Sequence, residues 1–218
     1  MIILSRQDLV DISAGWEVIS STEMAKGHIT TYLQDQVTTP SGDRVTREYL
    51  DHPGAVGVIA VDHEDRLALV RQYRHAARHR LIEPPAGLLD VDGEDYLLAA
   101  QRELAEEVGI AAGSWRVLVD LFMSPGMANE SLRVYLAEDL SATEVPEGFV
   151  LHGEEAEMDV VWAPLEDVVD AVLAGDLHNP VLVSGVLAAW AARQRGGFHT
   201  LRPASAPWPS REAERRLR

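Results

Sequence analysis

The stretch from residue 87 to residue 110, GLLDVDGEDYLLAAQRELAEEVGI, constrains the fold of this chain more than any other segment. Its apolar residues recur at helical spacing over about residues 95–108. The residues of this apolar stripe are Leu97, Ala100, Leu104 and Val108. Gly109 follows the stripe directly and predicts a left-handed cap that ends the helix. The segment therefore predicts an amphipathic helix that packs its stripe against a core.

The same helix carries a dense acidic cluster away from the apolar stripe. Glu103, Glu106 and Glu107 lie within five residues, and Glu103 and Glu107 are one helical turn apart. Such carboxylates repel one another unless a cation lies against them, and hard divalent metals prefer carboxylate oxygens. The cluster therefore favours a metal site. The alternative is the solvated polar face of an ordinary amphipathic helix.

This segment resembles the Nudix box, G-x5-E-x7-R-E-U-x-E-E-x-G-U, in which U is an aliphatic residue. From Glu94 onward every fixed position of the box is present. These positions are Glu94, Arg102, Glu103, Leu104, Glu106, Glu107, Gly109 and Ile110. One departure is visible, because six residues rather than five separate Gly87 from Glu94. The extra residue falls before the helix, so we expect it to alter that loop and not the metal-binding face.

Composition narrows the possible functions. The net charge of −16 argues against nonspecific binding to nucleic acid or to an anionic membrane. The absence of cysteine excludes disulfides, thiolate metal sites and cysteine nucleophiles. The sequence has neither a signal-peptide core nor a run long enough for a membrane span, so we expect a cytoplasmic protein.

The 218 residues suit one large domain with a smaller appendage. Residues 1–53 form the expected N-terminal region, which we expect to mediate dimerisation. Within it, residues 16–50 alternate in polarity and contain the turn at 40–43, which predicts a small antiparallel sheet of about three strands. Residues 54–195 form the expected main domain. Residues 196–218 combine prolines and arginines with few apolar side chains, so we expect a partly flexible tail.

Within the main domain, strands and helices are mixed. Strands are expected at 55–61, 67–70, 115–121, 131–136 and 160–162, and further helices at 165–174 and 180–194. Pro180 suits the first turn of the last helix. Mixed strands with helices on both sides predict an α/β/α sandwich, and the resemblance to Nudix proteins implies the same fold with a mixed sheet.

Four further features resemble the ADP-ribose pyrophosphatase group of that family. Pro125 lies sixteen residues after Gly109, inside Ser-Pro-Gly. Gln-Tyr-Arg at 72–74 and Glu-Pro-Pro-Ala-Gly at 83–87 match motifs of the group, with Pro84 replacing its usual aliphatic or aromatic residue. The N-terminal strands resemble its small sheet domain. The resemblance implies Mg²⁺-dependent hydrolysis of ADP-ribose to AMP and ribose 5-phosphate by a homodimer that exchanges this sheet.

The resemblance also implies roles for single residues in metal binding and catalysis. Glu103, Glu106, Glu107 and the carbonyl of Ala86 are expected to hold Mg²⁺ or Mn²⁺. Arg102 is expected to orient a glutamate, and Glu94 to be structural. The general base is expected in the loop 152–158, with Glu154 favoured and Glu155 second. The alternative is that this loop is only a solvated acidic segment.

For the substrate, we expect Arg74 to contact a phosphate or the ribose, and Arg47 to reach the site from the partner subunit. Glu130 is a candidate acceptor for the terminal ribose, in the loop that holds Pro125 and Gly126. The adenine needs an aromatic ring to stack on. The candidate rings are Trp16, Tyr32 and Tyr49.

Two other functions stay open at this stage. One is a pyrophosphatase for another nucleotide sugar, such as GDP-mannose or ADP-glucose. The other is a non-catalytic Nudix module that senses a nucleotide, since a shared fold does not fix function. The presence of every box glutamate counts against the sensor.

Overall fold

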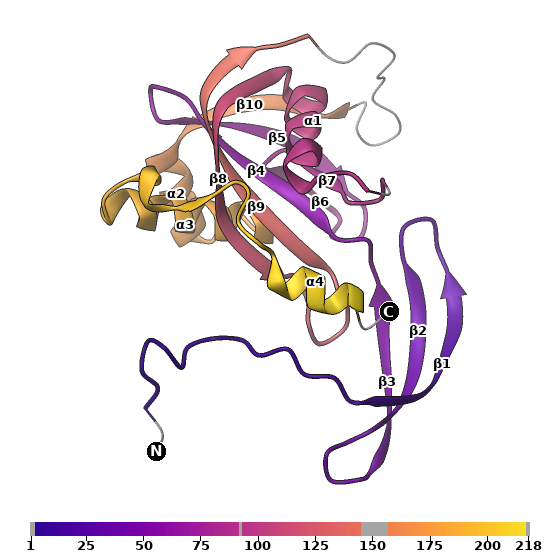
Figure 1. The fold of residues 1–218 in the computed structure, drawn as a ribbon. Helices are drawn as coiled ribbons and strands as arrows, with labels where there is room; N and C mark the ends of the chain where they lie inside the picture. The colour runs from indigo at the N-terminus through magenta and orange to yellow at the C-terminus, as the bar shows by residue number, and fades with distance from the viewer. Residues whose placement is uncertain (1–2, 92, 145–156, 217–218) are drawn as a thin grey trace. The chain divides into compact units, whose positions relative to one another are not determined.

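The computed structural model describes residues 3–91, 93–144 and 157–216 (Figure 1). The chain divides into two compact units. The smaller unit comprises Met1–His52, Gly126–Asn129 and Trp208–Arg218, and the larger comprises Pro53–Pro125 and Glu130–Pro207. The first boundary therefore falls beside the Pro53–Gly54 pair, where the sequence predicts one.

The smaller unit contains the expected antiparallel sheet of three strands. The strands are β1 (Glu17–Lys26), β2 (Thr31–Thr38) and β3 (Arg44–Asp51), in the order β1-β2-β3. The turn between β2 and β3 is closed by a 2.8 Å hydrogen bond from the Thr39 amide to the Asp43 carbonyl. Gly42 takes φ +89° there, a conformation that favours glycine. All ten residues of β1 are exposed.

The end of β3 binds a loop that is distant in the sequence. Leu50 forms a parallel bridge with Ala128, and its amide donates to the Met127 carbonyl at 2.9 Å. The side chain of Asn129 accepts from the His52 amide at 2.9 Å and donates to Asp51 Oδ1 at 2.6 Å. Residues 126–129 are therefore held by the N-terminal sheet.

The larger unit is built on a mixed sheet. Its strands are β4 (Ala55–Val61), β5 (Arg66–Arg74), β6 (His79–Glu83), β7 (Ala86–Leu88), β8 (Ile110–Phe122), β9 (Ser131–Ala142), β10 (Asp159–Pro164) and β11 (Arg202–Pro203). The order is β10-β5-β4-β9-β8-β11, with β6 beside β5 and β7 beside β4. The β4–β9 pair is parallel and the other pairs are antiparallel, so the sheet is mixed as expected.

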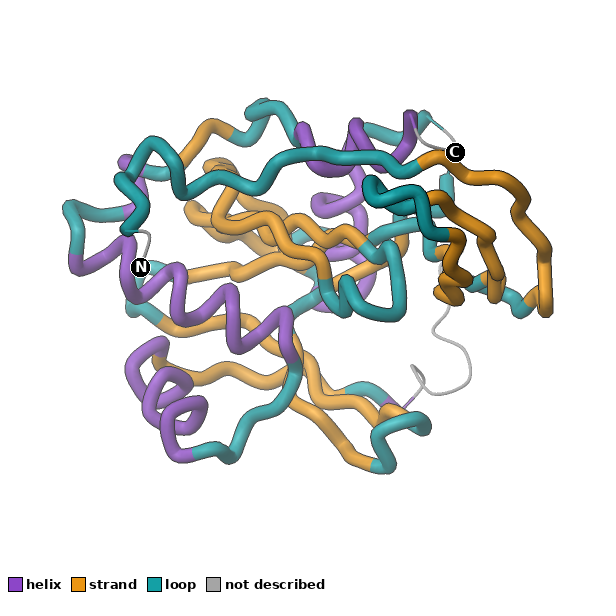
Figure 2. Tube along the Cα trace, turned by 90° about the horizontal axis from the view of Figure 1, so that it is seen from below, coloured by secondary structure: helices purple, strands orange, loops and turns teal. Residues whose placement is uncertain are grey.

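Helices cover both faces of this sheet, which confirms the α/β/α sandwich. Helix α1 (Tyr96–Val108) lies on one face, and α2 (Leu165–Ala174) and α3 (Pro180–Gln194) lie on the other (Figures 1 and 2). All three helices match the ranges expected from the sequence. Within the described residues, no helix is both long and apolar enough to cross a membrane.

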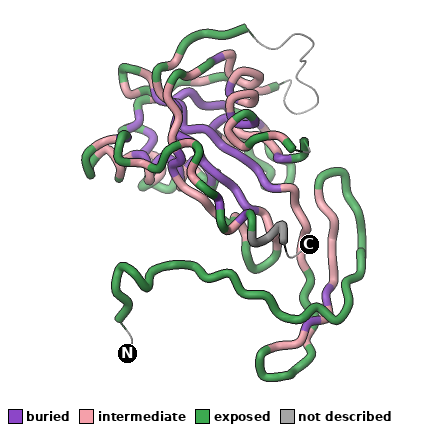
Figure 3. The backbone as a smooth tube through the Cα atoms, in the orientation of Figure 1, coloured by how far each residue is buried: buried purple, intermediate pink, exposed green. Residues whose placement is uncertain are grey.

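Buried side chains concentrate on the central strands of the larger unit (Figure 3). Every residue of β4 is buried, because the strand packs against α1 on one face of the sheet and against α3 on the other. Ile59 of β4 lies so close to Gly185 of α3 that a Cβ atom there would stand 2.7 Å from Ile59 Cγ1. This tight packing fixes α3 against the sheet.

The C-terminal segment differs from the flexible tail that its composition suggests. Phe198 starts a short 3₁₀ helix, η2 (Phe198–Thr200), and is buried, and β11 pairs with β8. Arg133 of β9 is only 1% exposed and donates to the carbonyls of Ala206 at 2.8 Å and Pro207 at 3.0 Å. The segment then continues into α4 (Pro209–Arg216). A buried arginine holds this proline-rich backbone, a contact that local composition does not reveal.

Candidate active site

Helix α1 presents the acidic cluster, and its ends are set by local chemistry. Asp95 is the N-cap, and its carboxylate accepts from the amides of Leu97 at 2.8 Å and Leu98 at 3.3 Å. Gly109 ends the helix with φ +68° and ψ 33°, the left-handed cap that the sequence predicts. Both caps satisfy backbone groups at the ends of the helix that carries Glu103, Glu106 and Glu107.

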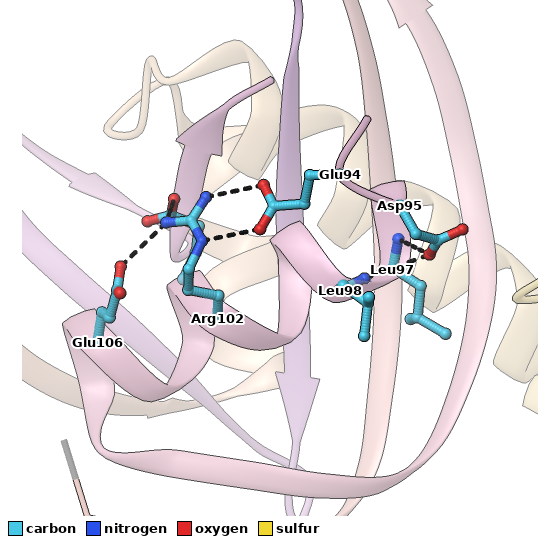
Figure 4. Close-up of polar contacts among 7 residues, drawn as sticks. Glu94, Asp95, Leu97, Leu98, Arg102 and Glu106 are labelled. Carbon is cyan, nitrogen blue, oxygen red and sulfur yellow. Dashed lines mark hydrogen bonds and ion pairs between the residues drawn. The ribbon is translucent and has the colours of Figure 1, made fainter. Parts of the chain in front are cut away.

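Arg102 lies among three carboxylates of the box (Figure 4). Its Nε and Nη2 donate to Glu94 at 3.0 Å and 3.1 Å, and its Nη1 donates to Glu103 at 2.6 Å and to Glu106 at 3.0 Å. The hydrogen bond to Glu94, with the nearby charge of Glu103, raises the pKa of Arg102 above its usual value. Arg102 is therefore a permanent cation that orients glutamates, and Glu94 supports it rather than standing apart.

Strand β7 lies against the side chains of Glu103 and Glu107 of α1. The Ala86 amide donates to Glu107 Oε2 at 3.0 Å. The side chain of Glu103 packs on Gly87 so closely that any Cβ atom at Gly87 would collide with its carboxyl group. Glu103 and Glu107 thus meet two consecutive residues of one strand. This contact identifies Gly87 as the glycine of the box, despite the extra residue after it.

The extra residue is absorbed by the loop between β7 and α1. There the Glu94 amide donates to the Val91 carbonyl at 3.2 Å, and Gly93 takes φ +79°. A turn of this kind accommodates one more residue without moving either neighbouring element. Helix α1 begins at Tyr96, after this turn.

The donor set fits a hard divalent ion. The residues that could hold it are Glu103, Glu106 and Glu107, through their carboxylates, and Ala86, through its carbonyl; Mg²⁺ and Mn²⁺ prefer oxygen ligands of this kind. Among the described residues, no group of three His, Cys, Asp or Glu side chains is arranged as a metal site. The reason is visible in the hydrogen bonds: Arg102 draws Glu103 and Glu106 to itself, and Glu107 bonds to Ala86.

Arg74 and Glu83 form an ion pair. Each residue belongs to one of the two motifs noted in the sequence, but the motifs alone do not show that the two side chains meet. Arg74 donates to Glu83 through Nε at 3.0 Å and 3.1 Å and through Nη2 at 2.6 Å. Gln72 Nε2 donates to the same carboxylate at 3.0 Å. Gln72 and Arg74 alternate on β5 and so share a face, and β6 pairs with β5. The spacing of two residues between Gln72 and Arg74 is the sequence signal that places them on one face, where both can reach Glu83 of the neighbouring strand.

The remaining candidate substrate residues are distributed between the units. Arg47 is exposed on β3, where its Nη1 donates to the Thr46 carbonyl at 2.8 Å. Gly126 belongs to the smaller unit, and Pro125 and Glu130 to the larger. The Glu130 carbonyl accepts from the Met123 amide at 3.0 Å, which closes the base of their loop.

The expected general bases, Glu154 and Glu155, lie outside the described residues. Glu157, just beyond them, pairs with Arg80 of β6 at 3.2 Å. Among the candidate aromatic rings, Trp16 is exposed, Tyr32 donates to Glu48 at 2.7 Å and Tyr49 donates to Asp35 at 3.1 Å.

Residues 51–182 match the model of the NUDIX domain, a span that contains α1, β7 and the Arg74–Glu83 pair. The chain belongs to the Nudix family. The match covers the whole box and most of the larger unit.

Several known proteins are similar to this chain. An ADP-ribose pyrophosphatase of Mycobacterium tuberculosis is 45% identical over 90% of this chain and 92% of its own length. A methanol dehydrogenase activator of Bacillus methanolicus is 33% identical over 78% of this chain and 90% of its own length. An ADP-ribose pyrophosphatase of Bacillus subtilis is 32% identical over 75% and 86%.

A solved structure supports the fold independently. The crystal structure of an ADP compounds hydrolase superposes with a TM-score of 0.70, covering 86% of this chain and 99% of its own, at 24% identity. At 24% identity, this similarity is evidence for the fold alone.

We predict that Gly87→Ala reduces turnover of the substrate by about 100-fold or more, because the new methyl group displaces the Glu103 carboxyl group. The matched control is Gly175→Ala at the end of α2, where φ is +81° and no atom lies near the added methyl group. We expect the control to cost about 1–3 kcal/mol of stability from backbone strain, with unchanged turnover. Steady-state kinetics and thermal unfolding measure both effects. Equal turnover by Gly87→Ala and the wild-type protein would contradict the role assigned to Gly87.

Proposed function

We propose that this protein hydrolyses the pyrophosphate bond of ADP-ribose to give AMP and ribose 5-phosphate. The observation that carries the proposal is that Glu103 and Glu107 of α1 contact two consecutive residues of β7, Gly87 and Ala86. Arg102 lies beside them and donates to Glu103. The complete box supports the chemistry, and the two ADP-ribose pyrophosphatase relatives support the substrate.

The proposed cofactor is Mg²⁺ or Mn²⁺. The residues that would hold it are Glu103, Glu106, Glu107 and the carbonyl of Ala86. When bound, such an ion activates a water molecule and neutralises phosphate charge. The protein's own part is to orient the individual carboxylates: Arg102 holds Glu103 and Glu106, and the Ala86 amide holds Glu107.

We expect the wild-type protein to form AMP from ADP-ribose in the presence of Mg²⁺, and Glu107→Gln to form little or none. Excess EDTA is expected to abolish the activity, and added Mg²⁺ to restore it. Chromatographic separation of the products measures both. Glu166→Gln, an exposed glutamate of α2, is the matched control and should retain full activity. Parallel reactions with GDP-mannose and ADP-glucose identify the preferred nucleotide sugar.

Failure of the wild-type protein to cleave ADP-ribose would overturn the proposed substrate. Cleavage of GDP-mannose or ADP-glucose alone would assign the other nucleotide-sugar activity. Binding of ADP-ribose without any cleavage would favour a nucleotide sensor.

Glu154 is the proposed general base, with Glu155 as the alternative. We predict that Glu154→Gln lowers turnover by about tenfold or more, because a typical general base contributes at least about that factor. Glu157→Gln is the matched control, since Glu157 pairs with Arg80 instead. Full activity of both Glu154→Gln and Glu155→Gln would contradict the assignment of the base to either residue. Stopped assays over a range of pH values measure the effect.

The proposed substrate contacts are Arg74, Arg47, Glu130, Pro125 and Gly126. Arg74 supports a phosphate or ribose contact through its charge and its fixed orientation. Arg47 is the proposed contribution from a partner subunit, and the loop from Pro125 to Glu130 is proposed to face the terminal ribose.

We further propose that the protein is a homodimer that exchanges its N-terminal sheet. Exposed apolar residues of the smaller unit support this, because large apolar side chains in water favour burial against a partner. These residues include Trp16, Val18, Ile19, Met24 and Ile29. We expect light scattering to give twice the 24.0 kDa mass of one chain. A mass of one chain across the accessible concentration range would contradict the proposal.

A further inference from the structure

Glu83 stands out as a buried carboxylate at the end of β6. It is 2% exposed, although it is charged, and a buried charge is tolerated only when it is paired. Its carboxylate accepts two bonds from Arg74 Nε and one from Arg74 Nη2, and one from Gln72 Nε2. The buried carboxylate therefore requires Arg74 to stay in this orientation.

The two partners differ sharply in exposure. The side chain of Glu83 is 3% exposed, and that of Arg74 is 47% exposed. An arginine on a surface normally samples many rotamers, and pairing through Nε and Nη2 removes that freedom. The result is a solvent-facing cation whose direction is set by a buried anchor.

A second ion pair on β5 shows the contrast. Arg71 pairs with Asp159 at 2.7 Å, and the two side chains are 48% and 50% exposed. Neither of them is anchored in the core, so this is an ordinary surface pair of small energetic value. The same strand thus carries one anchored arginine and one unanchored arginine.

Glu83 is also linked directly to the box. Pro84 and Pro85 follow it, and the next residue, Ala86, donates its amide to Glu107 at 3.0 Å. The Pro85 carbonyl accepts from the Val58 amide at 2.8 Å, which ties this short segment to β4. Two prolines have fixed φ angles, so the segment is stiff. This segment links Glu83, which holds Arg74, to β7, which contacts Glu103 and Glu107.

We propose that Glu83 is a positioning residue that orients Arg74 toward the phosphates or ribose of the nucleotide substrate. This inference rests on the proposed function. Glu83 does not touch the substrate itself. It acts by presenting the guanidinium in one direction, at a fixed place relative to Glu107, so that substrate binding does not have to order the arginine.

A double-mutant cycle tests this inference. The variants are Arg74→Ala, Glu83→Gln and the double variant, and the substrate is the one that the wild-type protein cleaves best. We expect Arg74→Ala to raise KM by about tenfold or more, the usual value of a charge-assisted hydrogen bond. Glu83→Gln should raise KM by about fivefold or more, with kcat changed by less than about threefold. The double variant should match Arg74→Ala within about twofold.

Three results would overturn the inference. The first is an unchanged KM for Glu83→Gln. The second is a double variant whose loss is the product of the two single losses, since Glu83 would then act independently of Arg74. The third is an equal rise in KM for the control Arg71→Ala, because a general charge effect would then explain the result. A wild-type protein that cleaves no nucleotide sugar overturns the proposed function, and this inference with it.

Arg74→Lys supplies a test that leaves buried Glu83 intact, in case Glu83→Gln does not fold. Lysine keeps the positive charge but cannot form the Nε and Nη2 pair. We expect it to raise KM by about fivefold or more while thermal unfolding stays close to that of the wild-type protein. A KM within about twofold of wild type would show that charge alone suffices and would overturn the inference.

Discussion

The mutual repulsion of the carboxylates on α1 is the constraint on which the site depends. Arg102 partly offsets it by bonding to Glu94, Glu103 and Glu106 together. One guanidinium cannot neutralise three carboxylates, and Glu107 adds a fourth charge nearby. The site therefore retains negative charge in a protein that is already acidic. A divalent cation relieves that repulsion, and the same cation attracts a pyrophosphate that the protein alone would repel.

The geometry of β7 follows from that constraint. Glu103 and Glu107 are one turn apart on α1 and meet the consecutive residues Gly87 and Ala86. Helix and strand approach this closely only because Gly87 has no side chain. The spacing between glycine and helix is less important, since the turn at Gly93 absorbs the extra residue. The box therefore specifies a contact between two elements more strictly than it specifies the loop joining them.

Local patterns predicted α1 and α3 well, because their end signals are encoded locally. Asp95 and Gly109 cap α1, and Pro180 occupies the first turn of α3. Long-range contacts were harder to predict. The short strands β6, β7 and β11 were not predicted as separate elements, since pairing with β5, β4 and β8 defines them. The C-terminal segment was predicted from its composition to be partly flexible, whereas the carbonyls of Ala206 and Pro207 accept hydrogen bonds from the distant Arg133, a contact that composition does not encode. In the site, the box residues followed from spacing, whereas the role of Glu83 required the register of β5 and β6.

Residues 126–129 belong to the smaller unit, whereas Pro125 and Glu130 belong to the larger. The base of this loop is closed by the Met123 amide and the Glu130 carbonyl in the larger unit. Its middle is held in the smaller unit, where Asn129 bonds to Asp51 and His52. The parallel bridge from Leu50 to Ala128 adds a third contact within the same unit. The end of β3 therefore fixes residues 126–129 by hydrogen bonds that join residues 77 and 78 positions apart, a contact that no local sequence pattern encodes.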